Sequence, residues 1–133
     1  MTSPVRIAIT GLGVFCAAGK DSAAYQASLL NGVSAIGPLE LFDTTGFPSR
    51  IAAQIKDFQP EELFSPLELR HLSRTDQIAL LAAQEAVAMS GLTQVYDPYQ
   101  VGICIGGGVG GMLHAEQWLQ AELAGQPASP NLL

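Results

Sequence analysis

The stretch ITGLGVFCAAGKDS, residues 9–22, contains an apolar strand-like run, three glycines, a lysine and an Asp-Ser pair that can begin a helix. This order outlines a phosphate-binding loop. A Walker loop needs four residues between its first glycine and Gly-Lys, whereas Gly13 and Gly19 enclose five, and Asp21 stands where Ser or Thr would hold magnesium. The dinucleotide fingerprint also fails, because Cys16 stands at its third glycine position. We therefore expect no phosphate here.

Strand and helix signals follow one another along the rest of the chain. We expect buried strands before it and near the end of the chain, and a long alanine-rich helix that is covered on nearly all sides. Ser, Asp and Gly residues mark the helix ends. The expected strands are Val5–Ile9, Ile51–Ile55 and Val101–Ile105, and the expected helices are Ser22–Asn31, short turns in Glu61–Leu69, Ser73–Ser90 and Met112–Ala124.

A second glycine loop, GGGVGG, follows the last expected strand. Gly106, Gly108 and Gly111 satisfy the dinucleotide spacing G-x-G-x-x-G between a strand and a helix. The acid that would bind the ribose is missing from its place, because Glu122 comes too early and lies within the following helix. We favour the alternative that these glycines permit close backbone packing, and keep a nucleotide-binding module as a lesser hypothesis.

The composition of the chain limits the kinds of partner and function that we expect for it. The 133 residues suffice for one modest domain, yet 48% are apolar and only 14% charged. We expect that the chain either buries its apolar faces very efficiently against itself or buries them against something else. A net charge of −6 argues against nucleic acid and anionic membranes as partners. Cys16 and Cys104 lack metal-ligand spacing, so we expect buried, reduced thiols, no metal and no cofactor. With no signal peptide or membrane-length apolar run, a cytoplasmic setting follows.

Four blocks in order carry a resemblance that covers essentially the whole chain. They are ITGLG at 9–13, LLNGVSAIGPLELFDTTGFPSRIAAQIKDF at 29–58, SRTDQIALLAAQEAVAMSGL at 73–92 and VGICIGGGVGG at 101–111. Together they resemble the N-terminal part of a β-ketoacyl-acyl-carrier-protein synthase, a thiolase-like condensing enzyme. The resemblance implies a partial thiolase-like layered α/β fold, a mixed sheet with helices packed on it. Residues 1–133 would form an incomplete N-terminal segment.

The resemblance also implies roles for individual residues. Val109 would line the acyl pocket, and Leu132 would reach the pocket of a partner subunit. Arg70, His71 and Arg74 would form a weak docking patch for acyl carrier protein, because this segment has fewer basic residues than is usual in the family. The implied partners are the carrier protein, acyl and malonyl thioesters, and a second ketosynthase-like subunit in a homodimer or heterodimer.

The family's reacting groups, a cysteine nucleophile and two histidines, match nothing in this chain. Cys16 and Cys104 lie at other positions, and His71 and His114 are expected to be surface or helix-flank residues. The complete protein would catalyse decarboxylative Claisen condensation of an acyl thioester with malonyl-carrier protein. The 133 residues alone are expected to be inactive, and the terminal Leu-Leu suggests an interrupted chain. The alternative is a non-catalytic partner that resembles a chain-length factor.

Overall fold

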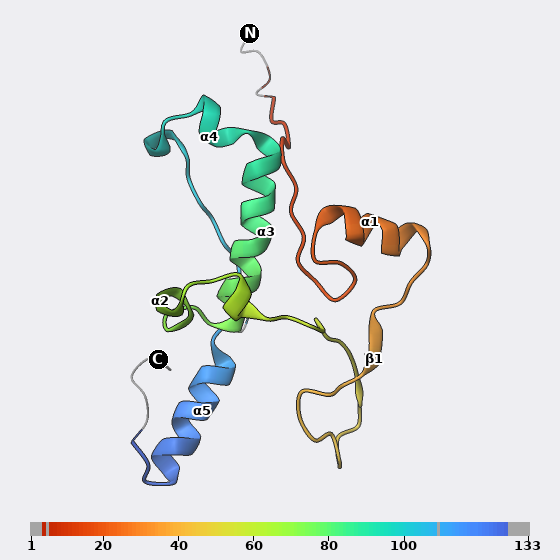
Figure 1. Cartoon of the computed structure of the whole chain (residues 1–133), viewed down its shortest axis with the longest axis vertical. Helices are drawn as coiled ribbons and strands as arrows, with labels where there is room; N and C mark the ends of the chain where they lie inside the picture. Colours follow the sequence, from red (N-terminus) through yellow and green to blue (C-terminus); the bar gives the residue numbers. More distant parts are fainter. Residues whose placement is uncertain (1–3, 5, 109, 128–133) are drawn as a thin grey trace. The chain divides into compact units, whose positions relative to one another are not determined.

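The computed structural model describes residues 4, 6–108 and 110–127 (Figure 1). The chain divides into two compact units. The first unit comprises Met1–Lys56 and Leu81–Gly102, and the second comprises Asp57–Leu80 and Ile103–Leu133. The boundary passes through the longest helix, α3 (Arg74–Ser90). Each unit therefore takes part of its structure from one end of that helix.

Helix α1 (Ser22–Leu30) begins and ends as its sequence predicts. The Asp21 carboxylate accepts a hydrogen bond from the Ala24 N–H at 2.7 Å, which caps the first turn. At the other end Gly32 takes a left-handed φ of 64°, and the Gly32 and Val33 N–H groups donate to the carbonyls of Leu29 and Ser28. This Schellman arrangement stops the helix where the glycine was expected to stop it.

A short hairpin follows α1 in the first unit. Strand β1 (Ile36–Pro38) pairs antiparallel with β2 (Ile51–Ala53), with Gly37 opposite Ala52. Beyond the ladder, Lys56 forms a salt bridge of 3.0 Å with Glu40. Strand β2 lies inside the segment 51–55, so that strand prediction is confirmed.

Helix α3 is capped at both ends by its own sequence. Ser73 Oγ accepts from the Asp76 N–H at 3.2 Å, and the Asp76 carboxylate accepts from the Ser73 N–H at 2.8 Å. This is a capping box with Asp in place of the usual Glu. Gly91, with a φ of 63°, ends the helix and leads into α4 (Leu92–Val95) and η2 (Pro98–Gln100).

The second unit is built from short turns and one further helix. It contains η1 (Pro60–Glu62), α2 (Pro66–Leu69) and α5 (Met112–Leu123). Pro66 occupies the start of α2, where a missing N–H costs nothing, so it begins this helix rather than interrupting it. Among the described residues, Phe64 and Gln77 are the buried ones; the Gln77 amide nitrogen donates to the Leu72 carbonyl at 3.0 Å.

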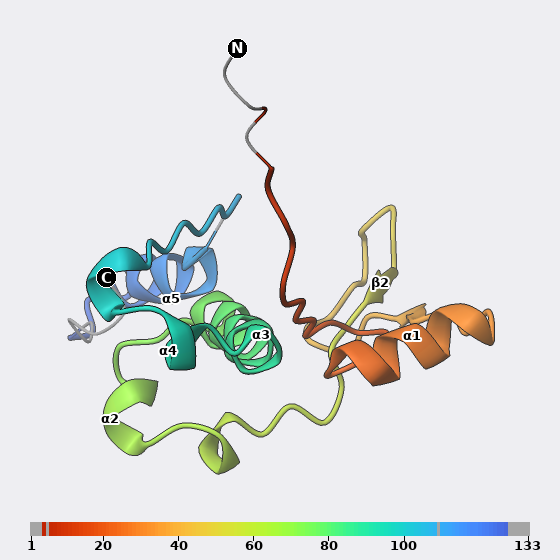
Figure 2. The same cartoon turned by 90° about the horizontal axis from the view of Figure 1, so that it is seen from above.

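The two outer strand predictions are wrong for the described residues. The segments 6–9 and 101–105 carry no strand pairing, and Figure 2 draws the first as a bare tube. Ile7 is 91% exposed, Ile9 83% and Ile103 85%. An apolar segment becomes a buried strand only when neighbouring strands take up its N–H and C=O groups, and such neighbours are absent from the described part of the chain.

Two burial predictions fail for the same reason. Helix α3 is not covered on nearly all sides, because Val87 and Met89 are exposed on its second half. Cys104 is exposed and Cys16 half-buried; both are free thiols. The sequence pattern correctly marks these positions as apolar, but what would cover them lies outside the described residues.

Candidate functional site

The first glycine loop packs directly on the backbone of α3. A Cβ added at Gly11 would collide with the Ala86 carbonyl oxygen, and one at Gly13 would collide with the Ala82 carbonyl oxygen. These two alanines lie one turn apart on the helix, so the extended chain follows its surface. Glycine is required at both positions because a larger residue would collide with the helix backbone, and no ligand is needed to explain it.

Glu85, between those two alanines, binds the loop that follows. Its Oε2 accepts from the Val14 N–H at 2.8 Å, and its Oε1 accepts from the Ser22 N–H at 2.8 Å and the Ser22 hydroxyl at 2.6 Å. The Ser22 hydroxyl, the Ser22 N–H and the Val14 N–H together hold the pKa of this carboxyl below its ordinary value. Glu85 thus joins residues 14–22 to α3.

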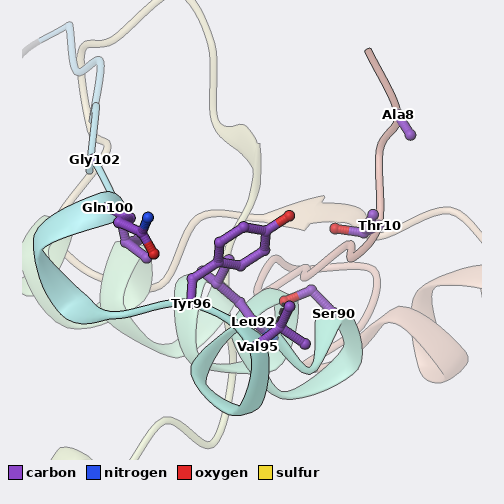
Figure 3. Close-up of a pocket in the computed structure, with 9 residues that line it drawn as sticks. Ala8, Thr10, Ser90, Leu92, Val95, Tyr96, Gln100 and Gly102 are labelled. Atoms are coloured by element: carbon purple, nitrogen blue, oxygen red, sulfur yellow. Dashed lines mark hydrogen bonds between the residues drawn. The ribbon is translucent and has the colours of Figure 1, made fainter. Parts of the chain in front are cut away.

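A hollow of about 640 Å³ opens in the first unit (Figure 3). Thr10, Ser90, Tyr96 and Gln100 supply polar groups, and Leu92 and Val95 supply apolar ones. In Figure 3 the Tyr96 hydroxyl points toward the side of the hollow where Thr10 lies. The described lining mixes polar and apolar groups and contains no Asp, Glu, His, Cys, Lys or Arg side chain, so it offers no acid–base pair for chemistry.

The second glycine loop does not show the close packing that its composition predicts. A Cβ at Gly106 or Gly108 would meet nothing within 4 Å in the described part of the chain. A Cβ at Gly110 would only reach ordinary contact with the Thr75 side chain, at 3.7 Å. In the described ranges no paired strand precedes the loop, so they do not contain the strand–loop–helix setting of a dinucleotide site.

A smaller hollow, of about 210 Å³, lies where this loop enters α5. Ser73, Arg74 and Thr75 line it from the start of α3, and His114 and Gln117 line it from α5. His114 is half-buried on the flank of α5, whereas His71 is exposed just after α2. The expectation of surface and helix-flank histidines is confirmed by these positions.

The expected docking residues differ in their surroundings. Arg70, the C-cap of α2, and His71 are exposed. Arg74 is half-buried, and its guanidinium lies over the Phe58 ring, 4.9 Å from the ring centroid. Residues 61–76 hold four carboxylates against two arginines. The segment is therefore weakly suited to attract an acidic partner.

The two expected pocket residues, Val109 and Leu132, lie outside the described residues. Among the residues that are described, no group of three or more His, Cys, Asp and Glu side chains is arranged to hold a metal ion. No helix in the described ranges has the length and apolar character needed to cross a membrane.

Glu85 is the structural residue that the sequence interpretation missed. It is one of two polar residues in an otherwise apolar stretch of α3, with Gln84 beside it. A carboxylate in that setting needs donors, and the Gly-rich segment supplies them through the Val14 N–H and the Ser22 N–H and hydroxyl. This signal was present, but the 63-residue separation from Ser22 hides the pair in the sequence.

Comparison with known proteins finds that this chain is similar in sequence to members of one family. The family model described as "Beta-ketoacyl synthase, N-terminal domain" matches residues 5–131. A 3-oxoacyl-[acyl-carrier-protein] synthase 2 of Coxiella burnetii is 37% identical over 127 residues, which are 92% of this chain. The granaticin polyketide putative beta-ketoacyl synthase 1 of Streptomyces violaceoruber is 37% identical over 105 residues, 78% of this chain.

A solved structure agrees with the sequence comparisons. The ishigamide ketosynthase/chain length factor superposes with a TM-score of 0.74 at 31% identity, over 93% of this chain. The thiolase-like α/β fold class expected from the sequence is thereby confirmed. The chain spans 30% and 25% of the length of the two sequence relatives and 32% of the solved chain.

Proposed function

Because this chain belongs to the β-ketoacyl synthase family, we propose that residues 1–133 are the N-terminal part of a longer 3-oxoacyl-acyl-carrier-protein synthase. The observation that carries the proposal is the family match over residues 5–131 together with the fold. The glycine segment packed on α3 supports it, because it accounts for Gly11 and Gly13 without any phosphate.

The complete protein would act as an acyltransferase. A cysteine thiolate would attack the acyl thioester, taking the acyl group and releasing the thiol that carried it. Malonyl-carrier protein would then lose carbon dioxide, and the resulting carbanion would attack the enzyme-bound thioester carbonyl, expelling the cysteine thiolate and forming 3-oxoacyl-carrier protein. Histidines stabilise the developing enolate or oxyanion. These groups are proposed to lie in the part of the protein beyond residue 133, since Cys16, Cys104, His71 and His114 do not match them.

The present chain would supply scaffold and part of the binding surfaces. Val109 is proposed to line the acyl pocket, and Leu132 to reach the pocket of a partner subunit in a homodimer or heterodimer. The complete protein would work in the cytoplasm without a cofactor. Acyl carrier protein would deliver both thioesters, with Arg70, His71 and Arg74 as its weak docking patch; Arg74 also packs on Phe58.

Charge reversal at the two arginines separates docking from packing. We expect Arg70→Glu to raise the KM for the carrier protein roughly two- to fivefold, the effect expected for one exposed charge contact, with unchanged stability.

Arg74→Glu is expected to lower the free energy of unfolding by about 1 kcal/mol, because it removes the cation–π contact with Phe58. Steady-state kinetics and thermal unfolding of both variants test this; equal KM values for Arg70→Glu and the parent would remove Arg70 from the docking surface.

The alternative is a non-catalytic partner that resembles a chain-length factor and shapes the acyl tunnel of a ketosynthase. The acidic balance of residues 61–76 and the packing of Arg74 on Phe58 favour it to a modest degree, because such a partner has no need of the carrier. The residue at the downstream nucleophile position discriminates: Cys supports the enzyme, and Gln or another residue supports the partner.

The test of the proposed function is condensation itself. The complete protein, incubated with an acyl thioester and malonyl-carrier protein, should release carbon dioxide and yield 3-oxoacyl-carrier protein in a mass-spectrometric assay. Residues 1–133 alone should yield none. Condensation only when a second ketosynthase subunit is added would instead favour the chain-length-factor-like partner.

A further inference from the structure

Residues 14–22 belong to the stretch whose sequence outlines a phosphate site, and they bind an anionic group of the protein itself. Three donors converge at residues 14–22: the Val14 N–H, the Ser22 N–H and the Ser22 hydroxyl. Ser22 is the first residue of α1, so its N–H belongs to the positive end of that helix. The Asp21 carboxylate caps the Ala24 N–H, which leaves the Ser22 N–H for another acceptor.

That acceptor is the Glu85 carboxylate of α3, which uses both of its oxygens. Oε2 accepts one hydrogen bond and Oε1 accepts two, all between 2.6 and 2.8 Å, distances typical of charge-assisted bonds. The donors lie 63 and 71 residues away in the chain. A carboxylate of the protein itself thus accepts the hydrogen bonds that residues 14–22 donate.

We propose that Glu85 is a built-in anionic ligand of this loop: its deprotonated carboxylate fastens residues 14–22 to α3, and its protonation releases them. The hydrogen bonds of Glu85 also determine which turn of α3 contacts Gly11 and Gly13. Ala82 and Ala86, whose carbonyls contact Gly13 and Gly11, lie three residues before and one after Glu85. Release of Glu85 would therefore loosen the close backbone contact as well. This proposal is independent of the condensing function.

Few other charges act on Glu85 from the elements around it. Lys20 and Asp21 are the charged residues of the segment 11–31, and Cys16 and Tyr25 are its remaining titratable groups. On α3 the positions three and four residues away, 81, 82, 88 and 89, are Leu, Ala, Ala and Met. The three donors of Val14 and Ser22 therefore dominate the setting of the carboxylate.

The direction of the pH effect follows from the pKa. Because the Ser22 and Val14 donors lower the pKa of Glu85 in the folded protein, the unfolded chain takes up this proton more readily. The contribution of Glu85 is then fully present above the ordinary glutamic pKa and is lost as the pH falls through the lowered value. On acidification, residues 14–22 should therefore open before the elements that no such carboxylate holds unfold.

Amide hydrogen exchange of the protein at its full length tests this proposal. In Glu85→Gln, we expect the protection factors of the Val14 and Ser22 amides at neutral pH to fall roughly tenfold or more, because an amide NH₂ then faces one or more of the donors. The parent should reach the same low protection on acidification, whereas Glu85→Gln should not change further. Glu116→Gln, which removes a carboxylate from exposed α5, is the matched control and should behave as the parent.

A second variant keeps the test decisive if Glu85→Gln fails to fold. Ser22→Ala removes the hydroxyl, the largest cause of the lowered pKa, and retains both N–H donors. The titration midpoint of the Glu85 carboxyl, followed by ¹³C NMR, should move up toward the ordinary value. Unchanged Val14 and Ser22 protection in Glu85→Gln, or an unchanged Glu85 midpoint in Ser22→Ala, would overturn the proposal.

Discussion

Replacing Gly13 with alanine is expected to lower the free energy of unfolding of the full-length protein by about 3 kcal/mol or more. The added methyl group would collide with the Ala82 carbonyl oxygen, which is fixed by the backbone of α3. A flexible side chain could move away, but a helix carbonyl is held by its own hydrogen bond. The whole segment 9–14 would have to lift from the helix to make room.

Gly37→Ala is the matched control for this substitution. Gly37 lies in β1, and a methyl group there would meet nothing within 4 Å, so stability should change by less than about 1 kcal/mol. Urea unfolding of the two variants beside the parent measures the difference. Equal midpoints and slopes for Gly13→Ala and the parent would show that the segment does not pack on α3 as described.

Residues 1–133 expressed alone are expected to associate or aggregate rather than to form a cooperative monomer. Among the described residues, Phe64 is the one buried apolar side chain, whereas the isoleucines at 7, 9, 103 and 105 are all more than 60% exposed. Unpaired extended segments of this kind bind to one another through their free N–H and C=O groups. The apolar surface needs further protein to cover it.

Light scattering after size exclusion, followed by thermal unfolding, measures this association. We expect oligomers with no sharp transition. The double substitution Ile7→Ser with Ile9→Ser removes two of the exposed apolar side chains and should raise the soluble fraction. A monodisperse monomer with a cooperative transition would contradict this prediction.

Local features of the fold could be predicted well from the sequence because they depend on nearby residues. Asp21, Ser73, Gly32 and Gly91 mark the helix ends that the structure has. These signals act within a few residues of the chain, through side-chain caps and left-handed glycines.

Long-range features could not be predicted in the same way. The segments 6–9 and 101–105 have the composition of buried strands, but burial depends on neighbours that the described residues do not contain. The contact of Glu85 with Val14 and Ser22 joins positions whose spacing carries no periodic signal. The glycines at 11 and 13 are conspicuous in the sequence, but only the structure shows that they meet α3.

The intact mass of the protein from its native source, recorded after incubation with an acyl thioester, tests the central claim most directly. If the protein is a condensing enzyme, we expect a species of about three times the 13.9 kDa of this chain, since the chain covers 30% of a relative. The mass of that species should increase by the mass of one acyl group. A species of that size without the gain would favour the chain-length-factor-like partner. A species of 13.9 kDa that gains nothing would contradict the claim that these residues belong to a longer condensing enzyme.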